Sequence, residues 1–200
     1  MNHKFFDITK EKQDRIINAA LKVFALNGYK HASTDDIVRE ASISKGLLFH
    51  YFGSKLGLYE FLYDYGTKFM LLELSGEVRQ SETNYFVVMR GVEAARMTVL
   101  KKYPYLRRFL DTAEEEDCEE AVQVICDPRE IYREKLRSIF AQADYHVFEP
   151  QADPDKMHKS IEFTLKGLTE EYSRKAGYTP EELYQEILEY LKMYEKMFLG

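Results

Sequence analysis

The chain has few of the residues that build disulfide or metal frameworks. Cys118 and Cys126 are its only cysteines among 200 residues, and no CxxC spacing occurs. A disulfide scaffold is therefore excluded as the organising feature, and reduced thiols predict a cytoplasmic protein. The five histidines are scattered, without HExxH spacing or paired ligands, so the sequence predicts no metal site and no cofactor.

Long apolar runs and chain breakers are also scarce. We find no signal peptide and no stretch apolar enough to cross a bilayer, which predicts no membrane partner. A nucleophile elbow, a P-loop and a GxGxxG loop are absent, so we do not expect an enzyme. Only five prolines and ten glycines occur, mostly at expected helix ends, and sustained two-residue alternation is missing. This combination favours an all-α fold.

Charge is distributed unevenly along the chain. The formal net charge is −6, yet residues 1–55 carry nine Lys and Arg against six Asp and Glu, whereas residues 56–200 carry 19 against 28. A slightly basic head on an acidic body has the charge distribution that a nucleic-acid-binding protein requires. We therefore expect two domains, residues 1–55 and residues 56–200.

The stretch ISKGLLFHYFGSKL, residues 43–56, carries the most informative pattern. Ser44 is a helix cap, and the short helix after it ends at Gly53. Leu48 and Phe52 are four residues apart and are expected to point into a core. The opposite face then exposes a cation and aromatic rings that require a partner surface: Lys45, Gly46, Leu47, Phe49, His50 and Tyr51.

Another short helix precedes this one. Its start, Ser33–Asp36, combines a hydroxyl cap with carboxylates at the positive end of the helix dipole, and it ends near Ala41–Ser42. Two short helices joined so tightly form a helix-turn-helix, whose second helix enters the major groove of DNA. Thr34 would offer its hydroxyl and a helix N-terminus to a phosphate.

Further helices are expected on both sides of this pair. One runs from about Thr9 to Asn27, with Gly28 as its stop, and residues 1–9 before it are expected to form a mobile arm. Later helices are expected over about 54–76, 82–102, 104–117, 119–144, 154–176 and 180–199, which gives about nine in all. Thr179 and Glu182 have the spacing of a capping box.

From about Lys10 to Lys55 the chain resembles the N-terminal domain of the tetracycline-repressor (TetR) family. The pattern is IINAALKVFALNGYKHASTDDIVREASISKGLLFHYFGSKLGLY, about a quarter of the chain. The resemblance implies a three-helix DNA-binding domain followed by a helical bundle that binds an effector and dimerises. It also implies that Ser44, Lys45, Gly46, Leu47, Phe49 and His50 face the groove, while Tyr51 and Lys55 hold phosphates.

Two positions depart from the family's usual pattern. Leu47 stands where threonine is common, and Phe49 stands where tyrosine is common. Both changes remove a hydroxyl, which favours apolar contact with a thymine methyl over polar readout. The same apolar surface leaves an alternative open, namely a helical ligand- or protein-binding module with no specific DNA readout.

The last two expected helices carry wide apolar stripes. Two such stripes at the end of a chain favour a four-helix bundle built across a two-fold axis, and the resemblance implies the same. The predicted dimer interface consists of Ile161, Leu165, Leu168, Leu183, Ile187, Leu191 and Tyr194. The alternative is that both stripes pack inside the monomer.

The second domain is also rich in aromatic side chains, which often line pockets between helices. The candidate effector contacts are Phe86, Met89, Met97, Tyr105, Phe109, Tyr132 and Phe163. Such a pocket would take a hydrophobic or aromatic small molecule. The sequence thus predicts a homodimeric, sequence-specific regulator, most simply a repressor, that binds a pseudo-palindrome in double-stranded DNA and is released by its effector.

Overall fold

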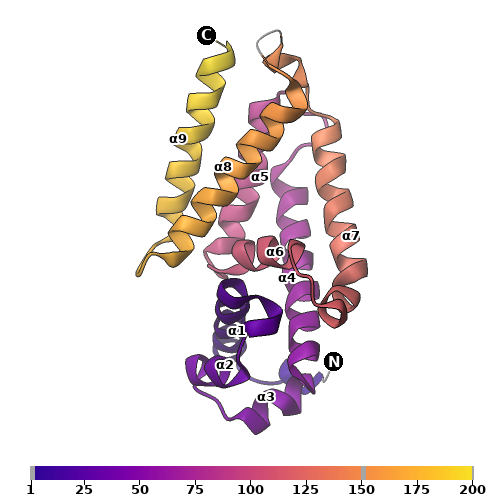
Figure 1. The fold of residues 1–200 in the computed structure, drawn as a ribbon, viewed down its shortest axis with the longest axis vertical. Helices are drawn as coiled ribbons and strands as arrows, with labels where there is room; N and C mark the ends of the chain where they lie inside the picture. Colours follow the sequence, from indigo (N-terminus) through magenta and orange to yellow (C-terminus); the bar gives the residue numbers. More distant parts are fainter. Residues whose placement is uncertain (1–2, 150–151, 200) are drawn as a thin grey trace. The chain divides into compact units, whose positions relative to one another are not determined.

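The computed structural model describes residues 3–149 and 152–199, and the elements of this part of the chain are helices joined by short connections. It contains nine α-helices and two short 3-10 helices, η1 and η2, so the predicted all-α class is confirmed (Figure 1). The elements are η1 (His3–Phe5), α1 (Lys10–His31), α2 (Thr34–Ala41), α3 (Lys45–Phe52), α4 (Lys55–Glu77), α5 (Tyr85–Leu100), α6 (Leu106–Glu114), α7 (Glu119–Ala141), η2 (Tyr145–Phe148), α8 (Pro154–Arg174) and α9 (Pro180–Leu199). Within these residues, no helix is long and apolar enough to span a membrane.

The helices fall into two compact units. The N-terminal unit holds the described residues up to Phe69 together with Tyr103–Ile131, and the C-terminal unit holds Met70–Lys102 with the described residues from Tyr132 onward. The N-terminal unit therefore contains α6 in addition to the three helices of residues 1–55. The division into a DNA-binding domain, residues 1–55, and an effector-binding and dimerisation domain, residues 56–200, is a prediction about function.

Helix α1 is the central support of the N-terminal unit. Its apolar side is fully buried and includes Ile16, Ala20 and Phe24. The helix bends at Gly28, where φ is 68° and ψ is 176°, a conformation available to glycine because it lacks a Cβ atom. The prediction that Gly28 interrupts the first helix is therefore confirmed.

Local caps set the limits of α2 and α3. The Ser33 hydroxyl accepts hydrogen bonds from the backbone N–H groups of Asp35 (3.2 Å) and Asp36 (3.4 Å), and this fixes the start of α2. The Ser44 hydroxyl accepts from the Leu47 N–H at 3.2 Å and begins α3. Gly53, at φ 75°, donates its N–H to the Phe49 carbonyl and ends α3. These caps were predicted from the sequence.

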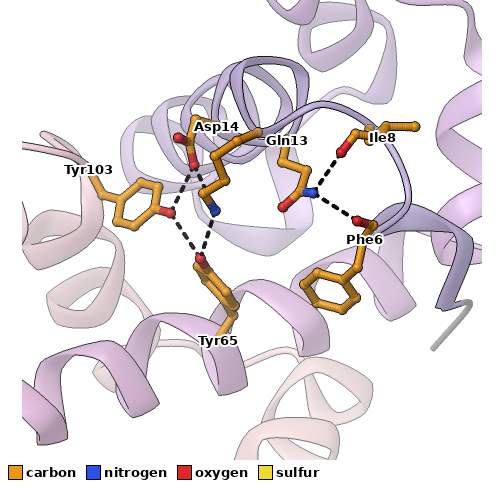
Figure 2. Close-up of polar contacts among 7 residues, drawn as sticks. Phe6, Ile8, Gln13, Asp14, Tyr65 and Tyr103 are labelled. Carbon is orange, nitrogen blue, oxygen red and sulfur yellow. Dashed lines mark hydrogen bonds and ion pairs between the residues drawn. The ribbon is translucent and has the colours of Figure 1, made fainter.

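The N-terminal segment is packed against the unit, so the expectation of a mobile arm is wrong for residues 3–9. Phe5 is fully buried, with its ring centroid 4.9 Å from that of Phe52 and 5.3 Å from that of Phe61. The Gln13 side-chain amide donates to the carbonyls of Phe6 and Ile8, at 3.2 and 2.9 Å (Figure 2). Burial of the Phe5 ring and the hydrogen bonds to the two carbonyls outweigh the conformational entropy that this segment loses when it is ordered.

A polar cluster joins α1 to α4 and to Tyr103, which lies in the connection before α6. The Tyr103 hydroxyl donates to Asp14 at 3.1 Å and lies 3.0 Å from the Tyr65 hydroxyl, which also accepts from Lys10 (Figure 2). Burial, followed by the hydrogen bond with Tyr65, raises the pKa of Tyr103 well above its ordinary value. The phenol therefore stays protonated and remains a donor at any physiological pH.

Helix α6 is bound to α1 by side chains that use a single backbone acceptor. The guanidinium of Arg108 and the hydroxyl of Thr112 both donate to the Ala25 carbonyl at 3.1 Å. Nearby, Glu116 accepts from the Tyr29 N–H at 2.9 Å and Glu120 accepts from the Tyr29 hydroxyl at 2.8 Å. The end of α1 is thus held by groups that lie far along the sequence.

In the C-terminal unit, α8 and α9 run side by side, and α9 also packs on α5 (Figure 1). A bidentate ion pair joins Arg90 on α5 to Glu195 on α9, with N–O distances of 2.8 and 3.2 Å. Thr179 and Glu182 exchange hydrogen bonds at the start of α9, which confirms the predicted capping box.

Candidate nucleic-acid interface

The outer face of α3 is the exposed side of the helix-turn-helix. Lys45, Gly46 and His50 are exposed there, and Leu47 and Phe49 are half-buried. Leu48 and Phe52 are buried, which confirms that they point into the core. One face of a short helix thus anchors it, while the other presents a cation, an imidazole and two apolar side chains to solvent.

An open hollow of about 550 Å³ lies beside this face. Its lining comes from the starts of α2 and α4 and from both ends of α3, and comprises Ala32, Ser33, Thr34, Lys45, Phe49, Gly53, Ser54 and Lys55. Free backbone N–H groups and hydroxyls at helix N-termini are typical ligands for the oxygens of phosphate. The lining of the hollow includes the hydroxyl side chains of Ser33, Thr34 and Ser54, and Thr34 is the predicted phosphate contact.

Lys45, the first residue of α3, does not stand alone in this hollow. Its ammonium lies 2.9 and 3.1 Å from the two carboxylate oxygens of Asp35 on α2. Both side chains are well exposed, Lys45 at 48% and Asp35 at 70%. Sequence inspection missed Asp35, because two residues ten positions apart are brought into contact only by the geometry of the turn between α2 and α3.

Lys55 has a structural role that the sequence did not suggest. Its ammonium donates to the carbonyls of Tyr29 (2.8 Å) and Ala32 (3.3 Å), and it lies 4.4 Å from the centre of the Tyr29 ring. These contacts bind the start of α4 to the connection between α1 and α2. A phosphate contact from Lys55 would have to be made in competition with these carbonyls.

Tyr51 is part of the core rather than of the exposed face. The side chain is only 6% exposed, and its ring packs edge-on against Phe5 at a centroid distance of 5.6 Å. The prediction treated Tyr51 as an exposed phosphate ligand, because nothing in the local pattern indicated that Phe5 would return to cover it. Its main contribution is to packing.

The predicted effector contacts are not gathered in one place. Phe86, Met89, Met97 and Tyr132 are buried in the C-terminal unit, whereas Phe109 is buried in the N-terminal unit, 5.4 Å from the Tyr59 ring. Tyr105 is half-buried in the N-terminal unit, and Phe163 is exposed on α8. A high content of aromatic residues could not show which of them line a pocket and which only pack in the core.

The residues predicted to form a dimer interface are turned into the monomer. Six of them are at most 8% exposed within a single chain: Ile161, Leu165, Leu168, Leu183, Ile187 and Leu191. The hydroxyl of the seventh, Tyr194, lies 2.8 Å from that of Thr164 on the neighbouring helix. This assignment is corrected, because α8 and α9 pack against each other, and α9 packs against α5, within the same chain. Their apolar stripes are therefore buried without a second chain.

Other apolar side chains of α8 and α9 remain exposed. Phe163 is 63% exposed, and Met193 and Met197 are 46% and 63% exposed. On α8, a Cβ atom added at Gly167 would meet nothing within 4 Å. We call Phe163, Gly167, Met193 and Met197 the outward surface of α8 and α9, and none of them was among the residues predicted to form the dimer interface.

Within the residues that the structure describes, no three His, Cys, Asp or Glu side chains come together as a metal site would require.

Comparison with known proteins points to the same region. Residues 16–62 match the family model for bacterial regulatory proteins of the tetR family. Fifty-nine residues are 44% identical to YuxN of Bacillus subtilis (strain 168), an uncharacterised HTH-type transcriptional regulator, covering 28% of this chain and 20% of YuxN. The HTH-type regulator HbdR of Aromatoleum sp. (strain CIB) is 42% identical over 48 residues, 24% of this chain and 21% of HbdR. The alignments thus span about a fifth of these relatives.

The whole fold has counterparts among solved structures. A TetR family transcriptional regulator from Chloroflexus aurantiacus J-10-FL superposes with a TM-score of 0.66 and 20% identity, over 98% of this chain and 95% of that one. The ketosteroid transcriptional regulator KstR2 of Mycobacterium tuberculosis gives 0.63 at 18% identity, over 92% and 94%. At these identities the likeness concerns the fold.

Proposed function

We propose that this chain is a TetR-family transcriptional regulator that acts as a homodimer on a pseudo-palindromic DNA site and is released by a small molecule; the match of residues 16–62 and the fold support the family. The observation that carries the proposal is the exposed face of α3 beside a hollow lined by helix N-termini and hydroxyls. Duplex DNA is complementary to that surface, because its phosphates accept hydrogen bonds and its major groove accommodates a helix.

In this proposal, α3 lies in the major groove with Lys45 and Gly46 leading. Side chains at the start of such a helix reach base edges, and a lysine donates to the O6 and N7 acceptors of guanine. Leu47 and Phe49 present carbon atoms rather than hydroxyls, so they suit the methyl group of thymine. Thr34 and the N-terminus of α2, at the hollow, would hold a phosphate, and Ser44 would contact DNA from the start of α3.

Two copies would be needed for a palindrome. The outward surface of α8 and α9 has the exposed apolar groups from which a symmetric, self-complementary contact is built. The open space over Gly167 allows a partner helix to approach closely. A dimer of this kind would present its recognition helices to half-sites about 34–36 Å apart, one turn of the duplex.

Release by a ligand would depend on α4. This helix is continuous from Lys55 to Glu77, and its residues belong to both compact units. A hydrophobic or aromatic molecule that binds one pose of this helix better than another would change the separation of the recognition helices. Typical coupling of ~1–3 kcal/mol corresponds to ~5–150-fold in DNA affinity, enough to switch transcription.

The proposal is tested by selection from a random-sequence duplex library with the purified chain. We expect enrichment of a pseudo-palindromic site. Replacing Lys45 with alanine should change the preferred bases at one position of each half-site, at a cost of about 1–3 kcal/mol, whereas Thr34→Val should weaken binding to all sequences. Lys68→Ala, an exposed lysine on α4, is the matched control.

The alternative function is a helical module that binds protein or ligand without reading DNA. The observation that favours it is the carbon surface of Leu47 and Phe49 on α3. The same selection separates the two functions. Enrichment of a defined site would exclude the alternative. If no sequence is enriched, the proposed function as a DNA-binding regulator is overturned.

A further inference from the structure

Each of the three acidic residues of α2 forms an ion pair with a cation of the N-terminal unit. Asp35 pairs with Lys45 of α3, Glu40 pairs with Lys22 of α1, and Asp36 pairs with Arg39 on the same helix. Two of these pairs therefore bridge separate helices. Lys22, Arg39 and Lys45 therefore already have carboxylate partners in the free protein.

Two further cations near α2 are held by backbone carbonyls. Arg15 donates to the Ala41 carbonyl at 2.9 Å, and Lys55 donates to those of Tyr29 and Ala32. Neutral acceptors leave the positive charge in place, whereas the carboxylates of α2 cancel it. The balance of charge at the recognition face is therefore set by α2.

The Lys45–Asp35 pair is poorly explained as a stabilising contact. An ion pair this exposed contributes between nothing and about 1 kcal/mol to folding, because water and salt screen it. Its effect on a bound polyanion is larger, since Lys45 must release Asp35 to contact a phosphate, or leave a carboxylate facing the DNA. Non-specific binding depends almost wholly on such phosphate contacts.

A base edge makes a different demand on the same carboxylate. The exocyclic amine of cytosine donates a hydrogen bond that an aspartate accepts, and the neighbouring guanine supplies acceptors for lysine. A pair made of Asp35 and Lys45 thus has a favourable partner in the correct groove and an unfavourable one along the backbone. The Asp35 carboxylate therefore disfavours binding to non-cognate duplex more than binding to the cognate site.

From this geometry we infer that Asp35 is a specificity-determining residue, which competes with DNA phosphates for Lys45 and thereby suppresses binding to non-cognate duplex. The inference rests on the proposed function and adds to it a device against wrong sequences. It accounts for a recognition helix whose leading cation is neutralised before DNA arrives.

The test compares wild type with Asp35→Asn on two duplexes. One is the sequence that wild type enriches from a random library, and the other is a scrambled duplex of equal length and composition. We expect the variant to bind the scrambled duplex about fivefold more tightly at low salt, because one adjacent negative charge is removed. Its plot of log affinity against log salt should steepen by about one. Affinity for the enriched duplex should rise less or fall.

Asp64→Asn is the matched control. Asp64 pairs with Lys68 at 2.7 Å on the exposed side of α4, so the same charge is removed and another lysine is freed away from α3. Equal gains for both variants on scrambled DNA, or none for Asp35→Asn, would overturn the inference while the regulator stands. Failure of wild type to enrich any duplex would instead overturn the proposed function, and the inference with it.

Discussion

At the scale of single residues, Gly28 shows how one backbone angle decides a local structure. Its φ of 68° and ψ of 176° lie in a region that only glycine occupies readily. A Cβ atom added there would lie 3.7 Å from a Glu116 carboxylate oxygen, an ordinary contact, so any penalty for a side chain is conformational rather than steric.

We therefore predict that Gly28→Ala destabilises the fold by about 1–3 kcal/mol in urea denaturation. Gly76→Ala is the control, because Gly76 lies in α4 and a Cβ there meets nothing within 4 Å. Alanine at that helical position should be neutral or stabilising, by up to about 1 kcal/mol. Equal effects at the two sites would show that the angle at Gly28 is not constrained.

His158 is the titratable residue whose surroundings make stability depend on pH. Its Nδ1 lies 2.8 Å from the Tyr85 hydroxyl, and its ring lies against those of Phe140 and Tyr145. Burial lowers the pKa of His158 below its ordinary 6.5, although the carboxylates of Glu162 and Asp155 act in the opposite direction. The neutral form is therefore the one that fits the folded state.

The stabilisation from neutral His158 is complete above pH 6.5 and is lost as the pH falls from 6.5 toward its lower folded pKa, because the unfolded chain takes up the proton first. We predict a smaller free energy of unfolding at pH 5.5 than at pH 7.5, and a weaker pH dependence in His158→Gln. His146→Gln is the control, since Glu149 raises the pKa of that exposed histidine. A pH dependence unaltered by His158→Gln would contradict the account.

At the scale of elements, the local signals were the ones that the sequence revealed. Ser33, Ser44 and the Thr179–Glu182 pair act within one helical turn, so their hydrogen bonds follow from spacing alone. Contacts over long separations were missed. Lys55 finds the carbonyl of Tyr29, and Phe5 covers Tyr51, only because α1 returns the chain to the same place.

The position of α3 depends on η1, which lies in the segment that was expected to be a mobile arm. We predict that Phe5→Ala lowers the free energy of unfolding by on the order of 3 kcal/mol, as for other fully buried phenylalanines. Phe6→Ala is the comparison, because Phe6 is 43% exposed and should cost much less. Similar losses at the two positions would mean that η1 does not anchor α3.

At the scale of the whole molecule, the apolar stripe predicted from periodicity in α8 and α9 is not the surface that remains available to a partner. Periodicity identifies the side of a helix that is buried, but it does not say whether the burial occurs inside the chain or between chains. In α8 and α9 the regular stripe is used within the chain, and Phe163, Met193 and Met197 remain outside. The self-complementary contact is accordingly proposed for the outward surface.

We predict that Phe163→Glu shifts the chain from dimer to monomer, since a buried charge at a symmetric contact appears twice. Sedimentation equilibrium measures the shift, expected as at least a tenfold weaker association. Ile131→Glu, at another exposed apolar residue on α7, should leave association unchanged. A Phe163→Glu chain that dimerises as wild type does would remove α8 from the interface.

The central claim is that two α3 helices meet one duplex at a separation fixed by the dimer. The most direct measurement is the affinity for the selected duplex before and after five base pairs are inserted between its half-sites, about half a helical turn. We predict that two chains bind the original duplex and that the insertion weakens binding at least tenfold, by turning one half-site away. Undiminished affinity for the lengthened duplex would contradict the account.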